Sequence, residues 1–216
     1  LDFFPGRIAD YEALLKENPI FQRRTKGVGF VSAEDAVAWG LTGPSLRASG
    51  VNWDIRKAQP YSGYDQYDFD VPTNTVGDIY ARYRCRMAEF WQSMRIIEQA
   101  LDNLPDGPIN IDDRKIVPPP RSELGSSMEA VIHHFKLWTD GFEMPEGSVY
   151  AATESPRGVL GVYLESDGST KPHRVHWRTP SFDNLQVLPV LAKDHLVADL
   201  VALVGTTDFV LGDIDR

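Results

Sequence analysis

The chain has 216 residues, 42% of them hydrophobic and 25% charged, which suits one domain or two small ones with a substantial core. Its net charge of -9 and its scattered Lys and Arg argue against binding to nucleic acid or to anionic lipid. It has no run of about 18 apolar residues, so no membrane-spanning helix is expected. The single cysteine, Cys85, excludes an internal disulfide and a cysteine-based zinc or iron–sulfur site, and favours a reducing, cytosolic compartment.

The N-terminal part reads as helix followed by a long loop. Apolar spacing predicts a helix over residues 8–18, which Pro19 breaks. Ser32 is a predicted N-cap for a short helix that stops at Gly40. Residues 41–75 are rich in Gly, Pro, Tyr and Asp and predict a long ordered loop, typical of a functional or partner-packed segment. Its expected apolar anchors are Trp53, Ile55, Tyr61, Tyr64, Tyr67 and Phe69.

Two longer helices are predicted in the middle of the chain. The first covers residues 76–104, where apolar residues repeat at spacings of three and four, as in a bundle helix. The second covers residues 122–140 and ends at Gly141. The apolar residues of the first are Ile79, Tyr83, Met87, Phe90, Met94, Ile97, Leu101 and Leu104. Those of the second are Met128, Val131, Ile132, Phe135 and Trp138.

From residue 148 onward the pattern changes to that of strands. Residues 148–153, 159–165 and 174–179 predict a small antiparallel sheet, with a turn at 166–169. Short helices are expected near 181–191 and 194–204, the latter ending at Gly205, and the apolar residues of the last eleven are expected to be buried. The fold class is therefore α+β, mainly a helical bundle. We expect a helical region over 1–145, a β region over 146–180 and a C-terminal region over 181–216.

Several motifs are weighed against a purely structural role. His133 and His134 are adjacent on a helix and point about 100° apart, so one solvated and one hydrogen-bonded histidine is expected rather than a metal site. Cys85 is interpreted as a buried, inert thiol. The glycines at 27–29 and 158–161 match no phosphate-binding loop.

Two charged segments leave alternatives open. The loop acids and bases at residues 54–57, 65, 68 and 70 form either a solvated surface or, given the interleaved aromatics, an interface. Glu154 and Arg157 flank a proline turn, where they form either a local ion pair or part of a polar network in a larger assembly.

Several long motifs then agree in order with one family. They lie at residues 49–57, 59–61, 67–72, 127–136, 154–158, 162–168 and 212–216. With them the whole chain resembles the D subunit of NADH-quinone oxidoreductase, or respiratory complex I, and specifically the C-terminal portion of that longer subunit. The chain begins with Leu1 rather than Met, which fits a fragment or a processed product.

The resemblance implies a fold related to the large subunit of nickel–iron hydrogenases. It implies a role in the peripheral arm, where electrons from NADH pass through iron–sulfur clusters to a quinone and drive proton pumping. The expected partners are other peripheral-arm subunits, including the one that holds the terminal iron–sulfur cluster, the membrane-arm subunits and the quinone substrate. No cofactor is expected on this chain itself. The implied location is peripheral, on the cytoplasmic face of a bacterial inner membrane or the mitochondrial matrix face.

The C-terminal run carries the residues that the resemblance implicates in quinone binding. Hydrogenases end in Asp-Pro-Cys-x-x-Cys-x-x-His, with cysteines that hold nickel. Here Asp208 matches the Asp, Val210 and Asp213 stand at the cysteine positions, and Arg216 stands at the His. Without thiolates no nickel site is expected. We expect Val210 to offer apolar surface to the quinone, and Asp208, Asp213 and Arg216 to line the same pocket.

Two departures from the family pattern limit what this chain does alone. Val159 stands where the family usually has an acidic residue after the Glu154 motif. The His and Tyr that bind the quinone headgroup in the family lie outside this sequence, so the chain alone is expected to be inactive. The alternatives are a scaffold without a pocket role, which contacts neighbours through residues 61–71 and its helix faces, and a hydrogenase-like nickel enzyme.

Overall fold

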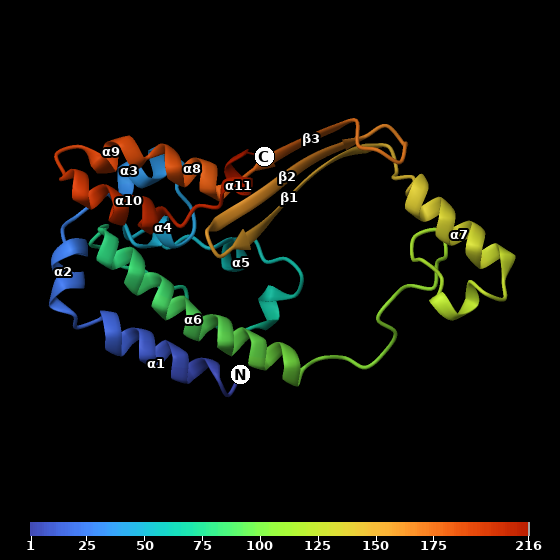
Figure 1. The fold of residues 1–216 in the computed structure, drawn as a ribbon, viewed down its shortest axis with the longest axis horizontal. Coiled ribbons are helices and arrows are strands. Elements are labelled where there is room, and N and C mark those ends of the chain that lie inside the picture. The colour runs from blue at the N-terminus through green and yellow to red at the C-terminus, as the bar shows by residue number, and fades with distance from the viewer. Residues whose placement is uncertain (216) are drawn as a thin grey trace. The chain divides into compact units, whose positions relative to one another are not determined.

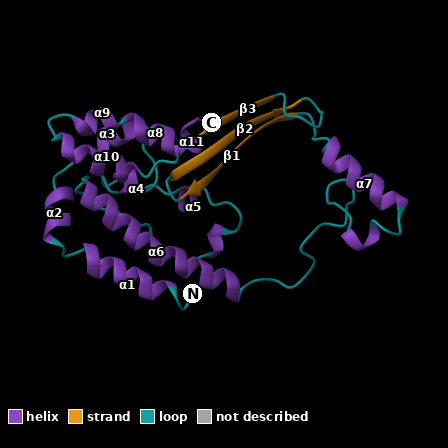
Figure 2. Cartoon of the chain, viewed as in Figure 1, coloured by secondary structure: helices purple, strands orange, loops and turns teal. Residues whose placement is uncertain are grey.

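The computed structural model describes residues 1–215 and has the predicted α+β composition (Figures 1 and 2). A single three-stranded sheet has the order β1-β2-β3 among these residues. Its strands are β1 (Gly147–Ser155), β2 (Gly158–Ser166) and β3 (Arg174–Arg178). The helices are α1 (Phe4–Leu15), α2 (Pro19–Thr25), α3 (Ala33–Ala38), α4 (Pro44–Arg47), α5 (Ile55–Ala58), η1 (Tyr64–Gln66), α6 (Ile79–Asp102), η2 (Arg121–Glu123), α7 (Met128–Thr139), α8 (Pro180–Gln186), α9 (Leu188–Ala192), η3 (Val197–Asp199), α10 (Leu200–Thr207) and α11 (Leu211–Asp215).

The chain divides into two compact units. The first combines Leu1–Asn103 with Ala152–Gly161 and the chain from Trp177 onward. The second consists of Leu104–Ala151 and Val162–His176. Within residues 1–215, no helix has both the length and the apolar character needed to cross a membrane.

The long helix α6 organises the first unit. Asp78 caps its N-terminus by accepting hydrogen bonds from the backbone N–H of Ala81 at 2.7 Å and of Gly27 at 2.8 Å. The prediction of this helix is confirmed, but its predicted apolar seam is only partly right. Ile79, Met87 and Met94 are buried, whereas the remaining seam positions are half-buried or exposed. The buried face also carries Ala81, Arg82, Cys85 and Ile96.

Arg82 shows how the buried face of α6 accommodates a charge. Its guanidinium donates to the carbonyl of Gly29 at 2.7 Å, the carbonyl of Gly77 at 3.1 Å and the hydroxyl of Thr206 at 3.0 Å. Burial, followed by the nearby charge of Arg86, lowers the pKa of Arg82 to about 10. Arg82 therefore ties the N-terminal part of the chain to the end of α10.

The N-terminal predictions were partly right. Pro19 does end one helix, but it also opens α2, because Asn18 caps the new helix and proline is favoured in its first turn. The Ser32 cap and the short helix after it are confirmed. The expectation of one continuous loop over residues 41–75 was wrong, since α4, α5 and η1 lie within it. These helices have only three or four residues, which is too short for a periodic signal.

Two facing glycines bring the turn between β1 and β2 against the start of α4. Gly43 has φ +64°, and a Cβ placed there would lie 2.6 Å from Cα of Gly158. The backbone N–H of Val159 donates to the Thr42 hydroxyl at 3.1 Å. Only glycine permits this close approach, and the side chains that flank the turn therefore reach α4.

The C-terminal helices are more broken than predicted. Residues 181–191 form α8 and α9 with a change at Val187, and residues 194–204 contain η3 and the start of α10. The prediction that the helix before the C-terminal run ends at Gly205 was wrong for α10. It continues to Thr207, and Asp208 takes the left-handed conformation that stops it, with φ +50°.

The second unit has little buried surface of its own. Its described residues include only three buried ones, Pro119, Ala130 and Ser166. The helix predicted at 122–140 is confirmed only from Met128 to Thr139, as α7, because residues 121–123 form the separate 3-10 helix η2. The Ser127 hydroxyl caps α7 by accepting from the Ala130 backbone N–H at 3.2 Å. Most of its apolar stripe faces outward, and Trp138 is 73% exposed.

Candidate functional site

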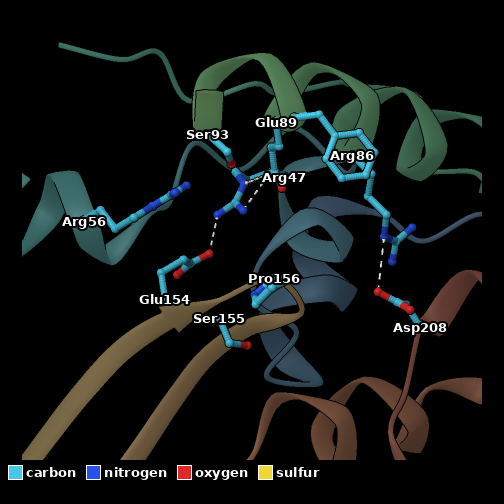
Figure 3. Close-up of a pocket in the computed structure, with 10 residues that line it drawn as sticks. Arg47, Arg56, Arg86, Glu89, Ser93, Glu154, Ser155, Pro156 and Asp208 are labelled. Atoms are coloured by element: carbon cyan, nitrogen blue, oxygen red, sulfur yellow. Dashed lines mark hydrogen bonds and ion pairs between the residues drawn. The ribbon is translucent and has the colours of Figure 1, made fainter. Parts of the chain in front are cut away.

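A buried arginine lies at the centre of the charged site in the first unit (Figure 3). Arg47, at the end of α4, has a relative exposure of only 1%. Its guanidinium donates to Glu89 of α6 at 2.8 and 2.6 Å, to Glu154 of β1 at 2.8 Å and to the Trp53 carbonyl at 3.1 Å. Burial works against the charge, but Glu89 and Glu154 outweigh it, and the pKa of Arg47 is raised.

Asp54 and Arg56 form the second layer of this charged cluster. Asp54 caps α5 and accepts from the backbone and side chain of Arg56, with the shortest contact at 2.6 Å from Nη2. Arg47 Nη1 lies 3.7 Å from the same carboxylate. Burial alone would raise the pKa of Asp54, but its hydrogen bonds from Arg56 and the two positive charges lower it. Asp54 is therefore held ionised.

Glu154 is the least satisfied carboxyl of the cluster. Its side chain is 3% exposed, and only Oε1 has a partner, which is Arg47. The buried Oε2 has no hydrogen-bond partner among the described residues. Burial raises the pKa of Glu154 despite the nearby charge of Arg47. The hydroxyl oxygen of Tyr61 accepts from the Glu154 backbone N–H at 2.8 Å and fixes the strand end.

A second pair of arginines holds the backbone at Asp208. Arg157 Nε donates to the Asp208 carbonyl at 2.6 Å, and Arg86 Nη2 donates to the Thr206 carbonyl at 2.8 Å. The Arg157 carbonyl in turn accepts from Asn184 at 3.1 Å. These bonds fix the left-handed turn at the end of α10 and so set the direction in which the last residues leave it.

The predicted quinone-pocket residues lie on this C-terminal turn and on α11. Asp213 accepts from the Ser181 backbone at 3.1 Å, and Val210 donates through its backbone to the Ser181 hydroxyl at 3.4 Å. Val210 is 42% exposed and Leu211 71%, and Phe209 and Ile214 are only half-buried, so the expectation of a buried end was wrong. Arg216 lies outside the described residues.

Glu154 and Arg157 do not form the local pair that was one of the two interpretations. They leave the β1–β2 turn toward different partners, Glu154 toward Arg47 and Arg157 toward Asp208. The proline turn separates them so that each reaches a different element of the first unit. Val159, at the position where an acid was expected from the resemblance, is buried.

The charged loop is neither wholly a solvated surface nor wholly an interface, because its acids differ in burial. Asp54 is buried in the cluster, which contradicts a solvated surface at that residue. Asp68 and Asp70 are exposed and pair with Arg95 of α6. Aromatic anchors of the loop contact one another edge to face, and the ring centroids of Tyr61 and Tyr64 lie 5.0 Å apart.

The cysteine and histidine interpretations can be compared directly with the structure. Cys85 is buried, as expected, and burial raises its thiol pKa to about 11, which favours an unreactive thiol. His133 Nε2 lies 3.7 Å from Glu129 Oε1. The rings of His134 and Trp138 are tilted against each other, with centroids 6.0 Å apart. Within the described residues no group of three or more acidic, histidine or cysteine side chains is arranged to hold a metal ion.

Sequence reasoning missed the residues at the centre of the site. Arg47, Arg86 and Glu89 were not singled out, although Arg82, Arg86, Glu89 and Ser93 repeat at spacings of four, three and four. That polar stripe on a helix was the available signal. Arg47 gave none, because its partners Glu89 and Glu154 lie 42 and 107 positions away in the sequence.

Comparison with known proteins identifies the family of the chain. The model of the family "Respiratory-chain NADH dehydrogenase, 49 Kd subunit" matches residues 1–216. The chain therefore belongs to the family of the 49 kDa subunit of respiratory-chain NADH dehydrogenase.

Curated relatives are named as the D subunit of NADH-quinone oxidoreductase. One from Roseiflexus sp. (strain RS-1) is 59% identical, and the match covers 100% of this chain and 52% of the relative. One from Herpetosiphon aurantiacus is 55% identical over 100% and 52% of the two chains, and one from Rhodospirillum centenum is 53% identical over 99% and 54%. The chain thus spans about half the length of these relatives.

Proposed function

We propose that this chain forms part of the wall of a quinone-binding cavity in a proton-translocating NADH:quinone oxidoreductase. Membership of the 49 kDa subunit family and the name of the relatives support this role. In this proposal the quinone is a substrate, and the terminal iron–sulfur cluster beside it is held by a neighbouring subunit. The only cysteine here, Cys85, is buried with a raised thiol pKa and is unsuited to ligate a cluster.

The observation that carries the proposal is the geometry of the C-terminal turn. Arg86 and Arg157 fix the backbone before Val210, and the Val210 side chain remains partly exposed. An exposed valine on a rigid turn offers apolar surface to a quinone ring or tail, while Asp208 and Asp213 provide polar framing. Arg216 is the proposed fourth member of this lining.

The reduction adds two electrons and two protons to the quinone, and this chain supplies binding surface and charge rather than a redox centre. We propose a hydrogenase-like arrangement of the complete subunit. Its partners are the subunit with the terminal cluster, other peripheral-arm subunits and the membrane arm. The complex places the chain peripherally on the cytoplasmic face of a bacterial inner membrane, or on the corresponding matrix face in mitochondria.

The test is Val210→Met in the full-length subunit within the assembled complex. The longer side chain changes the pocket wall, and we expect KM for quinone to rise about tenfold with much less change in kcat. Val201→Met is the matched control, because Val201 is also an exposed valine but lies on α10 before the turn. Unchanged KM and unchanged inhibitor sensitivity in Val210→Met would count against the proposal.

A second candidate function is a scaffold without a pocket role. The exposed apolar stripe of α7 favours it, because large exposed apolar patches mark interaction sites. This function predicts that Val210→Met leaves quinone kinetics unchanged, while substitutions on α7 reduce assembly. The stripe and the C-terminal turn belong to different units, so the α7 and Val210 substitutions test docking and the pocket role separately.

A further inference from the structure

A cavity of about 270 Å³, with several charged residues in its lining, lies beside the buried charged cluster. Glu154 stands on one side, and Arg86 with Asp208 stands on the other (Figure 3). The cavity belongs entirely to the first unit. Its lining residues are Arg47, Arg56, Arg86, Glu89, Phe90, Ser93, Glu154, Ser155, Pro156 and Asp208.

Two residues of the lining each have one buried polar atom without a hydrogen-bond partner among the described residues. These atoms are Oε2 of Glu154 and Nε of Arg86. Arg86 Nε is 4.0 Å from Asp208 Oδ2, which is an ion-pair distance but is too long for a direct hydrogen bond. A cavity of this size has room for several water molecules, and each needs two to four polar partners. The walls supply such partners at both ends.

The acids of the cluster differ in how many contacts they receive from an arginine. Three acids, Asp54, Glu89 and Glu154, share two guanidinium groups, those of Arg47 and Arg56. Asp54 takes the bonds of Arg56, and Glu89 takes two from Arg47. Glu154 receives a single Arg47 contact through Oε1. It is therefore the carboxyl that gains most from being neutral.

We propose that Glu154 is a proton-exchanging group that takes up and releases a proton through water held in this cavity. An O–H bond forms at Oε2 as an O–H bond of a protonated cavity water breaks, and the reverse step returns the proton. No electron is transferred, and the guanidinium groups keep their protons. This proposal rests on the proposed function in one respect. Quinone reduction near Asp208 supplies the change of charge to which Glu154 responds.

The electrostatic surroundings are consistent with this assignment. Burial, and then the like charge of Asp54, favour the protonated form and raise the pKa of Glu154, against the effect of Arg47 and Arg56. A raised pKa brings the carboxyl closer to neutral pH, where a proton carrier must work. The titratable or charged groups around Glu154 and its cavity are Arg47 of α4, Asp54 and Arg56 of α5, Tyr61 before η1, Arg86 and Glu89 of α6, Arg157 of the turn and Asp208 after α10.

The experiment is infrared difference spectroscopy of the assembled complex between its oxidised and reduced states. The carbonyl stretch of a protonated carboxyl, which shifts in heavy water, reports uptake or loss of the proton. We expect this signal in the native complex, its loss in Glu154→Gln and a displaced signal in Glu154→Asp. Glu98→Gln is the matched control, because Glu98 is exposed on α6, and it should keep the native signal. A native-like signal in Glu154→Gln, or none in the native complex, would overturn the proposal.

A second variant tests the water path without altering the buried ion pair of Glu154 and Arg47. Ser93→Val adds apolar volume to the cavity wall while leaving the Glu154 and Arg47 side chains unchanged. We expect the carboxyl signal to weaken and the pH profile of quinone reduction to shift, and an unchanged signal and profile would contradict the water path.

The result is separable from the proposed function. If Val210→Met leaves quinone KM unchanged while Glu154→Gln loses the signal, the proposed quinone wall is rejected and the proton site stands. The opposite pattern rejects the proton site alone.

Discussion

The two compact units of the chain differ in which side chains they bury and which they leave exposed. The first buries charged groups and matches most of them inside the chain, with Arg47 as the shared partner of Glu89 and Glu154. The second buries very little and leaves the apolar stripe of α7 exposed, including Phe135 and Trp138. Buried paired charges specify geometry, whereas exposed apolar surface requires a partner. We therefore expect the first unit to form the site and the second to bind a partner.

The largest expected effect follows from removing the shared cation of the first unit. Arg47→Met leaves Glu89 and Glu154 buried without their main partner, and we expect the full-length subunit to lose about 3–5 kcal/mol of unfolding free energy. Chemical denaturation measures it. Arg95→Met is the matched control, because the pairs of Arg95 with Asp68 and Asp70 are exposed and should contribute below about 1 kcal/mol. Equal losses in both variants would remove the distinction between buried and surface charge.

The second prediction concerns the apolar stripe of the second unit. Trp138→Gln removes a large exposed aromatic group, and covering such a side chain in an assembly contributes about 1.5–3 kcal/mol. We expect less of the subunit to be retained in the complex after dilution, as measured on native gels. Lys136→Gln, an exposed change on the same helix, is the control. Equal retention of the two variants would show that the stripe has no partner.

The third prediction uses the two buried carboxyls of the cluster, whose pKa values are shifted in opposite directions. The pKa of Asp54 is lowered below 3.8, so its stabilisation is present above that pH and is lost as the pH falls through the folded value. The pKa of Glu154 is raised above 4.5, so its ionisation costs stability as the pH rises from 4.5 through the folded value.

Measurements of unfolding free energy against pH test this opposition. The difference between the native subunit and Asp54→Asn should shrink as the pH falls below 3.8, because the unfolded chain is protonated first and the folded protein only at its lower pKa. Glu154→Gln should instead remove a loss of stability that begins above pH 4.5. Asparagine and glutamine keep the side-chain oxygen that accepts from Arg56 or Arg47. Parallel curves for all three proteins would contradict the pKa directions.

The smallest effect concerns Cys85. Its thiol pKa of about 11, against the usual 9.0, lowers the thiolate fraction near neutral pH about 100-fold. Alkylation of the folded subunit should be slower than that of the unfolded chain by at least this factor, since burial adds to it. Reaction of Cys85 at the rate of a free thiol would show that this face of α6 opens in solution.

The local elements were largely predictable from the sequence, because their signals are local. Ser32 and Ser127 are cap residues at the positions where α3 and α7 begin, and the apolar spacing of α6 extends over many turns. The end of α10 was not predictable in the same way. Gly205 is the usual stop signal, yet the helix continues until Asp208 adopts the left-handed turn, where Arg157 binds its carbonyl.

The candidate site was predictable only in part, since its centre depends on tertiary contacts. Asp208, Val210 and Asp213 were selected through a resemblance that extends to the last residues of the chain. The partners of Glu154 and Arg157 come from α4 and from the end of α10, far from both in sequence. The glycine contact between Gly43 and Gly158 that brings the turn to α4 has no local signature.

The most direct test of the central claim is photoaffinity labelling of the assembled complex with a quinone that carries a light-activated group. Peptide mapping of the full-length subunit would then locate the adducts. The account predicts adducts in the C-terminal segment that contains Val210, and competition by unlabelled quinone should abolish them. Labelling that leaves this segment unmodified while modifying other parts of the complex would contradict the claim that it borders the quinone.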